Sequence, residues 1–334
     1  YGARPLKRAL IVVAALLGAP IFVLLGGVAL ILFFADGVPT AAISVEIHRI
    51  IGSLLIPTIP LFTLTGYLLA EGGAGTRLVR LFRAVFGWIP GGTVIATTLV
   101  CAFFTTFTGA SGVTIVALGG LLLPVLVKNQ LSERFSLGLL TSTGSIGLLF
   151  PPSLAVILYA VVAHVPIVDL FQVAVIPGVL MVGAIALFGI RESAKTKAPR
   201  PRFDRREAAE AIRESKWEIL LPMIVLVGVF GGVTTLIEAA AITVVYALVV
   251  ETVIHRDLDI VRDIPRVLLK SSAMIGGIFI ILGVAMGLTN YIVDAEVPML
   301  AADWVRANVD SRFLFLFALN VFLLLVGCLM DIFS

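Results

Sequence analysis

The sequence predicts an all-α polytopic membrane protein, on three observations. Of the 334 residues, 60% are hydrophobic and only 13% are charged, and the mean hydropathy of +1.12 lies far above that of soluble globular proteins. Long apolar runs with few charges recur along the chain, each sufficient to cross a hydrocarbon core of about 30 Å as a helix. The sequence lacks the short alternating strands of a membrane β-barrel, so we expect helices throughout.

The apolar runs set the expected spans. The first run, from Ala9 to about Phe34, is too long for a secretory signal peptide and has no small-residue cleavage site, so we expect it to remain in the membrane. The expected spans, in order, are 9–34, 50–71, 91–127, 135–163, 168–190, 217–234, 236–253, 267–291 and from 312 onward.

Basic residues are distributed unequally between the predicted loops. Of the 24 Lys and Arg residues, only Arg49, Arg306 and Arg312 fall on one side. The remaining 21, including all those in the basic segment 191–216, fall on the other, which the positive-inside rule makes cytoplasmic. A multi-pass protein is therefore expected, with a cytoplasmic loop at 191–216 that is either a linker or a lipid-facing helix.

Segment 91–127 fits this distribution only if it enters from the cytoplasmic side and returns there. Arginines precede it and Lys128 follows it on the same predicted side. Its centre, residues 105–112, reads TTFTGASG, and such small and hydroxylic residues turn a chain at membrane depth where protein or a cavity satisfies the backbone. We therefore predict a re-entrant hairpin over about 91–127.

The order of elements suggests an internal repeat. Segment 50–71, the amphipathic piece Ala74–Phe86 and the hairpin have counterparts in 267–291, 292–309 and the run from Phe313. The charge distribution places the two connecting pieces on opposite sides, which predicts an inverted-topology repeat. We expect a first repeat over 1–190, the basic loop 191–216, and a second repeat over 217–334 that is truncated within its hairpin.

The predicted span 135–163 contains the stretch GSIGLLFPPS, residues 144–153. Pro151 and Pro152 lack backbone N–H groups and disfavour helical geometry before them, so carbonyls at about 146–149 lose their helical partners. Carbonyl and hydroxyl oxygens are hard ligands suited to Na+, and a half-helix beginning at Ser153 presents N–H groups to an anion. The break therefore predicts one site for a cation and an anion together.

Two acidic residues within apolar runs are further candidates. Glu238 and Asp331 are expected to be buried as counter-charges, cation ligands or proton carriers, with a capping or snorkelling role left open because both lie near segment ends. Cys101 and Cys328 have no metal or redox spacing and are read as small buried side chains. The three histidines are isolated and are assigned no ligand role.

Residues 109–162 resemble the large membrane subunit of the tripartite ATP-independent periplasmic (TRAP) transporters. Within this stretch, the resemblance rests on the glycine and serine spacing up to Leu123-Pro124, on Arg134-Phe135 and on the Pro-Pro-Ser segment. Three motifs elsewhere in the chain support it: Pro60-Leu61-Phe62 with Gly66, Asp169-Leu170-Phe171 with Ile176-Pro177-Gly178, and Glu238-Ala239-Ala240-Ala241. Two positions depart from the pattern, since Leu236-Ile237 replaces the usual Pro-Thr and Val125 follows Pro124 where an acid is usual.

The resemblance implies a Na+-coupled secondary transporter of the bacterial inner membrane that moves its hairpins as an elevator. It implies import of organic acids such as C4-dicarboxylates or sialic acids, delivered by a periplasmic binding protein, and a small four-helix membrane subunit that is separate or fused. Neither an organic cofactor nor a nucleic acid is expected. The candidate substrate-binding residues are Thr108, Gly109, Ala110, Ser111, Thr143, Pro152 and Ser153. The candidate Na+ ligands are Gly109, Ser111, Gly112, Gly144, Ser145, Gly147, Pro151 and Asp331, with Glu238 as a further functional residue.

Three other functions compete with this interpretation. An ion channel also uses re-entrant hairpins, but it favours one repeated pore-lining element over an inverted repeat. A proton-coupled organic anion transporter that works without a binding protein would use Glu238 or Asp331 as its carrier. An enzyme is not expected, because the sequence has no metal-ligand cluster, nucleophile elbow or phosphate loop.

Overall fold

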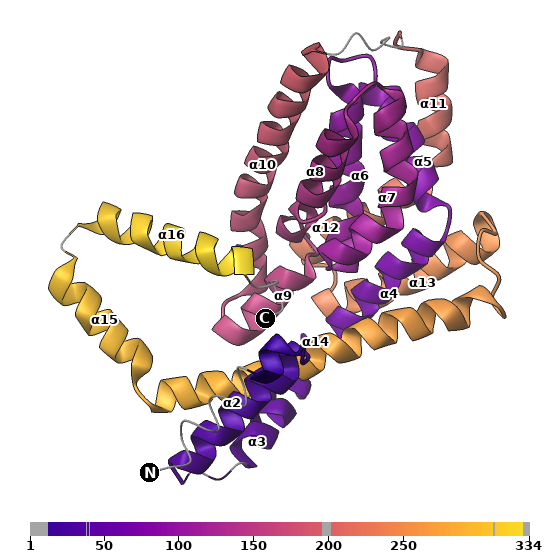
Figure 1. The fold of residues 1–334 in the computed structure, drawn as a ribbon. Coiled ribbons are helices and arrows are strands. Elements are labelled where there is room, and N and C mark those ends of the chain that lie inside the picture. The colour runs from indigo at the N-terminus through magenta and orange to yellow at the C-terminus, as the bar shows by residue number, and fades with distance from the viewer. Residues whose placement is uncertain (1–12, 38, 40, 196–201, 310, 330–334) are drawn as a thin grey trace. The chain divides into compact units, whose positions relative to one another are not determined.

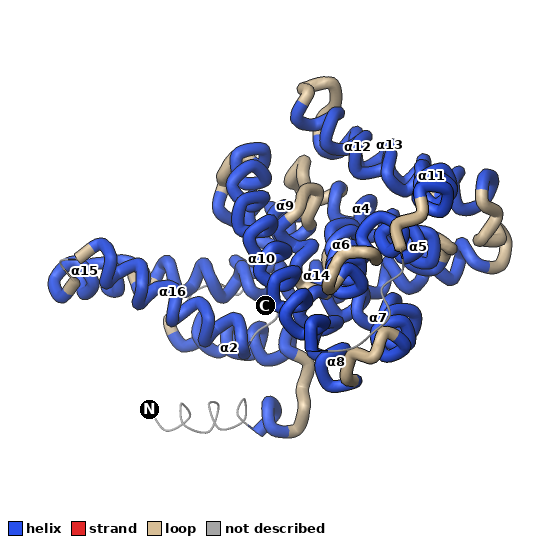
Figure 2. The backbone as a smooth tube through the Cα atoms, turned by 90° about the horizontal axis from the view of Figure 1, so that it is seen from above, coloured by secondary structure: helices blue, strands red, loops and turns tan. Residues whose placement is uncertain are grey.

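The computed structural model describes residues 13–37, 39, 41–195, 202–309 and 311–329. All regular structure within these ranges is helical, and no strand is found in them (Figures 1 and 2). Four helices are long and apolar enough to cross a membrane, and a fifth is counted if a bent pair is taken as one span. The predicted all-α polytopic membrane fold is confirmed.

The chain divides into two compact units. One unit comprises Leu54–Ala273, and the other comprises Tyr1–Ser53 together with Met274–Ser334. This division by contacts does not follow the predicted repeat boundary around 191–216. The division does not test the predicted repeat. An inverted repeat is defined by the order of its elements and their orientation in the membrane, and a grouping of residues by contacts shows neither.

The smaller unit contains the N-terminal helices and the C-terminal part of the long helix α14. Within it, Phe33 of α2 and Tyr291 of α14 pack edge to face with ring centroids 5.5 Å apart. Gly26 of α2 allows close approach, since a Cβ there would lie 3.1 Å from Val284 Cγ1. The helices of this unit are α2 (Ile21–Ala35), α3 (Ala41–Ile51), the end of α14 (Asp263–Asp294), α15 (Val297–Asn308) and α16 (Arg312–Leu329).

The larger unit contains the hairpin, the break and the charged segment. In Figure 1, α6 and α7 lie side by side, with α8 and α5 beside them. Its elements are α4 (Thr58–Glu71), α5 (Ala74–Phe86), α6 (Gly92–Thr108), α7 (Ser111–Lys128), α8 (Glu133–Thr143), the 3₁₀ turn η1 (Ile146–Leu149), α9 (Leu154–Ala163), α10 (Ile167–Lys195), α11 (Arg205–Glu214), α12 (Lys216–Phe230), α13 (Leu236–Val249), the π-helical turn η2 (Val250–Ile254) and the start of α14.

The segment predicted as a hairpin over 91–127 forms two helices, α6 and α7, joined by a turn, while its re-entry into the membrane stays a prediction. Gly109 ends α6 in the left-handed conformation, with φ of +68°, and its N–H donates to the carbonyl of Thr105. Such a φ suits glycine because it has no Cβ. A Cβ at this position would also lie 2.1 Å from Leu154 Cδ1, so the turn requires glycine on two grounds.

The break predicted within 135–163 is also confirmed. Helix α8 ends at Thr143, the chain passes through η1 and a cis Pro151–Pro152 peptide, and α9 begins at Leu154. The helical segments on the two sides are bent by 48°. The two prolines account for this, because neither can donate to the helical ladder.

Two expected spans are corrected. The span predicted over 9–34 is interrupted in its described part, where Gly18 has φ of +79° and α2 begins only after Pro20. The span predicted over 50–71 is not continuous, because turns occupy residues 54–57 before α4 begins after Pro57. Within segment 191–216, residues 191–195 end α10 and Arg205–Glu214 form α11, so the helical alternative that the sequence left open is the one observed in these residues.

Candidate functional site

Hydroxyl groups of the hairpin satisfy carbonyl groups of the break. Thr105 and Thr106 lie on α6, near the hairpin turn. The Oγ1 of Thr105 donates to the carbonyl of Gly144 at 2.8 Å, and the Oγ1 of Thr106 donates to the carbonyl of Gly147 at 3.1 Å. The hairpin and the break are therefore joined by polar contacts between buried residues.

The oxygen atoms around Thr105 outnumber the protons available to them. Its single hydroxyl proton faces the carbonyl of Cys101 at 2.8 Å, the carbonyl of Gly144 at 2.8 Å and the Oγ1 of Thr114 at 3.0 Å. The Oγ1 atoms of Thr108 and Thr114 are 2.9 Å apart, and either can donate. All three threonine side chains are fully buried. We call Thr105, Thr108, Thr114 and the carbonyl of Gly144 the oxygen cluster; its ligand chemistry is that of hard cations.

Glycines allow the backbones around this cluster to approach closely. A Cβ on Gly66 of α4 would lie 2.6 Å from the backbone nitrogen of Thr108, and a Cβ on Gly147 would lie 2.2 Å from the carbonyl oxygen of Ala102. A Cβ on Gly144 would lie 2.6 Å from Ile115 Cγ1 on α7. Helix α4, both arms of the hairpin and the break therefore meet at the hairpin tip.

The structure brings some of the sequence-predicted residues into this region and leaves others at its edge. Thr108, Gly109, Thr143, Gly144, Gly147, Pro151, Pro152 and Ser153 are buried, and Ala110 and Ser111 are half-buried. Gly112 and Ser145 are exposed, and the hydroxyl of Ser145 donates to the carbonyl of Ser142 at 3.0 Å. Thr143 is buried but donates within its own helix, to the carbonyl of Leu139 at 2.8 Å.

Ser153 differs from the other hydroxyl residues of the break. It precedes α9 but makes no capping hydrogen bond to that helix. Its Oγ is buried and has no hydrogen-bond partner among the residues that the structure describes. A buried polar atom without a partner carries a free-energy cost, which a bound ligand removes.

The expectation of a buried acid at Glu238 is wrong. Glu238 is exposed and forms a capping box at the start of α13, in which its Oε2 accepts from Thr235 N–H at 2.8 Å and its own N–H donates to Thr235 Oγ1 at 3.3 Å. The capping role that the sequence left open is the one observed. Asp331, the second expected acid, lies outside the described residues.

A buried charge network, which the sequence did not predict, surrounds Arg77 of α5. Its Nε lies 2.5 Å from Glu218 Oε1, its Nη2 lies 3.0 Å from Glu251 Oε1, and its Nη1 contacts Asp257. Burial raises the pKa of the Asp257 carboxyl, but the hydrogen bond and charge of Arg77 outweigh it, so the pKa lies below its ordinary value. These partners come from distant parts of the chain, so no local pattern relates them. The one sequence signal of the network was an acid, Glu251, at the end of an apolar run.

Comparison with known proteins decides between the classes of membrane protein. A family model described as "Tripartite ATP-independent periplasmic transporter, DctM component" matches residues 9–334. The chain belongs to this family. This DctM-family protein is therefore a multi-pass membrane component of a TRAP transporter and not an enzyme, as the resemblance implied.

Relatives of this DctM-family protein carry different names. It is 30% identical to the C4-dicarboxylate TRAP transporter large permease protein DctM of Rhodobacter capsulatus, over 96% of this chain and 77% of that protein. It is 28% identical to the ectoine/5-hydroxyectoine TRAP transporter large permease protein UehC of Ruegeria pomeroyi, over 95% and 75%. It is 30% identical to the isethionate TRAP transporter permease protein DctMQ of Oleidesulfovibrio alaskensis, over 94% of this chain and 50% of that protein.

Proposed function

We propose that this DctM-family protein couples Na+ entry to the import of an organic acid anion, with both bound where the hairpin meets the break. The observation that carries the proposal is the contact between Thr105 Oγ1 and the carbonyl of Gly144, at 2.8 Å. It joins helix α6 of the hairpin to the break through the oxygen cluster, which has fewer hydroxyl protons than acceptor positions. The fit to Na+ rests on these neutral, hard oxygen atoms.

The anion is proposed to bind at the start of α9. The unpartnered hydroxyl of Ser153 lies there, together with the positive end of the helix dipole. Leu154 of the same helix contacts Gly109 at the hairpin tip. In this proposal the cation and the anion are neighbours, and binding of one favours binding of the other.

The transport cycle is proposed to be an elevator movement of the hairpin and break within an inverted-repeat protein. Inward movement of each Na+ releases about 2.3 kcal/mol of free energy per 100 mV of membrane potential. A dianionic substrate needs two such ions merely to become neutral. A periplasmic binding protein that delivers the substrate and a small four-helix subunit, separate or fused as in a DctMQ protein, are the proposed partners in the inner membrane.

Uptake in proteoliposomes tests the proposal. The chain is reconstituted with its small subunit and binding protein, and accumulation of a radiolabelled C4-dicarboxylate is measured under an imposed Na+ gradient or an imposed pH gradient. Uptake that requires the Na+ gradient is the expected result. Uptake that ignores Na+ and follows the pH gradient, without the binding protein, supports the proton-coupled alternative and overturns Na+ coupling.

A further inference from the structure

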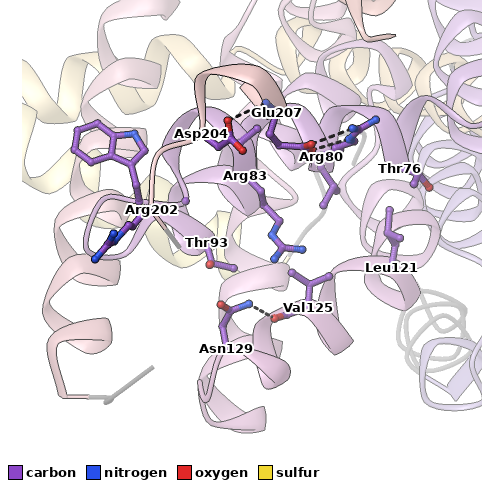
Figure 3. Close-up of a pocket in the computed structure, with 14 residues that line it drawn as sticks. Thr76, Arg80, Arg83, Thr93, Leu121, Val125, Asn129, Arg202, Asp204 and Glu207 are labelled. Carbon is purple, nitrogen blue, oxygen red and sulfur yellow. Dashed lines mark hydrogen bonds and ion pairs between the residues drawn. The ribbon is translucent and has the colours of Figure 1, made fainter. Parts of the chain in front are cut away.

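A second site lies at the opposite end of the hairpin from the tip. Here the structure has a pocket of about 710 Å³ between α5, the open end of the hairpin and α11 (Figure 3). The arms of the hairpin are about 25 Å long at 1.5 Å per residue, so this pocket is remote from the oxygen cluster. It plays no part in the proposed binding of Na+ and substrate.

The pocket carries two arginines without counter-ions. Arg80 is neutralised on its rim, because its guanidinium group donates to Glu207 at 2.8 and 3.1 Å and also contacts Glu214. Arg83 and Arg202 line the same pocket and form no ion pair within the described residues. In Figure 3, the guanidinium group of Arg83 points into the space between Thr93, Val125 and Asn129.

Acidic residues near these arginines are already engaged. The carboxylate of Asp204 accepts from the backbone N–H of Arg206 at 2.8 Å and caps α11. Glu207 is paired with Arg80, and the hydrogen bond from that arginine, together with its charge, holds the pKa of the Glu207 carboxyl below the ordinary value. The pocket is lined by three arginines and two acids, which leaves one net positive charge, and Arg83 and Arg202 are its arginines without an ion pair among the described residues.

Aromatic contacts fix the wall of the pocket next to Arg202. The ring centroids of Trp88 and Phe203 are 6.0 Å apart, and Trp88 Nε1 donates to the carbonyl of Val85 at 2.8 Å. The chain at 202–204 is thereby held against the end of α5. Opposite this wall, Leu121 and Val125 of α7 give the pocket an apolar side.

We propose that this pocket binds the phosphate headgroup of an anionic phospholipid. Guanidinium groups bind phosphate oxygens in pairs of hydrogen bonds; Arg83 supplies one such group inside the pocket, and Arg202, which points away from Arg83 in Figure 3, supplies a second at its edge. The charge distribution of the sequence predicts that this end of the hairpin faces the cytoplasm, where basic pockets between membrane helices bind anionic headgroups. A tryptophan at the rim is typical of the membrane interface.

The apolar side of the pocket favours a phospholipid headgroup over a soluble phosphate as the ligand. Inorganic phosphate or a small soluble phosphate would use only the arginines. A phospholipid also places its glycerol and the first part of an acyl chain against Leu121 and Val125, which removes apolar surface from water. The combination of two free guanidinium groups with an apolar wall favours the lipid.

Lipid titration of the complete transporter tests the proposal. The purified complex, with its small subunit, is delipidated in detergent and titrated with phosphatidylglycerol, phosphatidylcholine or inorganic phosphate, and bound lipid is counted by native mass spectrometry. We expect saturable binding of phosphatidylglycerol that Arg83→Gln and Arg202→Gln each weaken about tenfold. The matched control is Arg262→Gln, which removes an exposed arginine outside the pocket on the same predicted side of the membrane.

Three results would overturn the proposal. Equal binding of phosphatidylglycerol by the pocket variants and by Arg262→Gln would show that only overall charge matters. Equal binding of phosphatidylcholine would remove the role of the anionic headgroup. Binding of inorganic phosphate as tight as that of phosphatidylglycerol would assign the pocket to a soluble anion. All three substituted side chains are exposed, so folding of the variants is expected to be unaffected.

Discussion

The guanidinium Nε of Arg77 lies 2.5 Å from Glu218 Oε1, and 7% and 0% of the two side chains are exposed. The contact joins α5, which leads into the hairpin, to α12, and the neighbouring Glu251 adds η2 to the same network. The hydroxyl of Ser215 also donates to the carbonyl of Arg77 at 3.1 Å. The segment that precedes the hairpin is thus fixed by buried charge and not by apolar packing alone.

We predict that Arg77→Gln lowers the free energy of unfolding by about 3–5 kcal/mol, because it leaves buried carboxylates without their counter-charge. The matched control is Arg80→Gln, one helical turn away, whose exposed ion pairs are worth about 1 kcal/mol or less. Thermal unfolding of the purified complex in detergent measures both. Equal shifts of Tm in the two variants would show that the buried network contributes no more than a surface ion pair.

A second prediction concerns the oxygen cluster. Thr105→Val keeps the shape of the side chain but removes the hydroxyl that faces Gly144, so we expect the Na+ concentration for half-maximal uptake to rise at least about tenfold. Thr98→Val is the control, since Thr98 is equally buried on α6 but donates only within its helix, to the carbonyl of Val94 at 2.9 Å. Unchanged Na+ dependence in Thr105→Val would remove the cluster from the cation site.

A third prediction concerns the two serines of the break, which the sequence analysis assigned to different ligands, Ser153 to the substrate and Ser145 to Na+. Ser153→Ala removes a buried hydroxyl without a described partner, so the free protein should be as stable as the parent or more stable. If that hydroxyl binds the substrate, KM should rise severalfold at the same time. Ser145→Ala removes an exposed hydroxyl that already donates to Ser142, and we expect little change in KM. Substrate-dependent uptake and Tm, measured side by side, distinguish binding from a structural effect.

A fourth prediction tests the close packing of the break on the hairpin. Gly147→Ala places a Cβ 2.2 Å from the carbonyl oxygen of Ala102, so the two segments must separate, at a cost of about 1–3 kcal/mol. Gly138→Ala is the control, because nothing lies within 4 Å of a Cβ there and alanine favours the helical conformation of α8. We expect lower Tm and lost uptake in the first variant only. A Gly147→Ala protein with parental uptake would show that this contact is not needed for transport.

The hairpin and the break could be predicted because their signals are local. Glycine and hydroxyl residues at 105–112 and the two prolines at 151–152 disfavour a continuous helix whatever surrounds them. The spans over 9–34 and 50–71 were overextended because apolar length was given more weight than Pro20 and Pro57, which end helices by the same physics.

The network around Arg77 could not be predicted in this way. Its partners lie 141, 174 and 180 residues further along the chain, and no local period relates them. The packing of α6 against the break likewise decides which carbonyl groups of the break accept hydrogen bonds from hydroxyl groups. Loss of N–H groups indicated that acceptors would be left over near 146–149. Gly147, which accepts from Thr106, lies in this range, whereas Gly144, which accepts from Thr105, lies before it.

The last prediction concerns Glu238, which the sequence offered as an ion or proton carrier and the structure places in a capping box. Glu238→Gln keeps an acceptor for the N–H of Thr235 and should lower stability by less than about 1 kcal/mol, whereas Glu238→Ala loses the box and should cost about 0.5–2 kcal/mol. A carrier would behave in the opposite way, because glutamine removes the titratable group as completely as alanine does. Uptake by Glu238→Gln that retains the parental dependence on Na+ and pH, together with a lower Tm only in Glu238→Ala, assigns the residue to the start of α13. Lost coupling in Glu238→Gln at unchanged Tm would return it to the transport pathway.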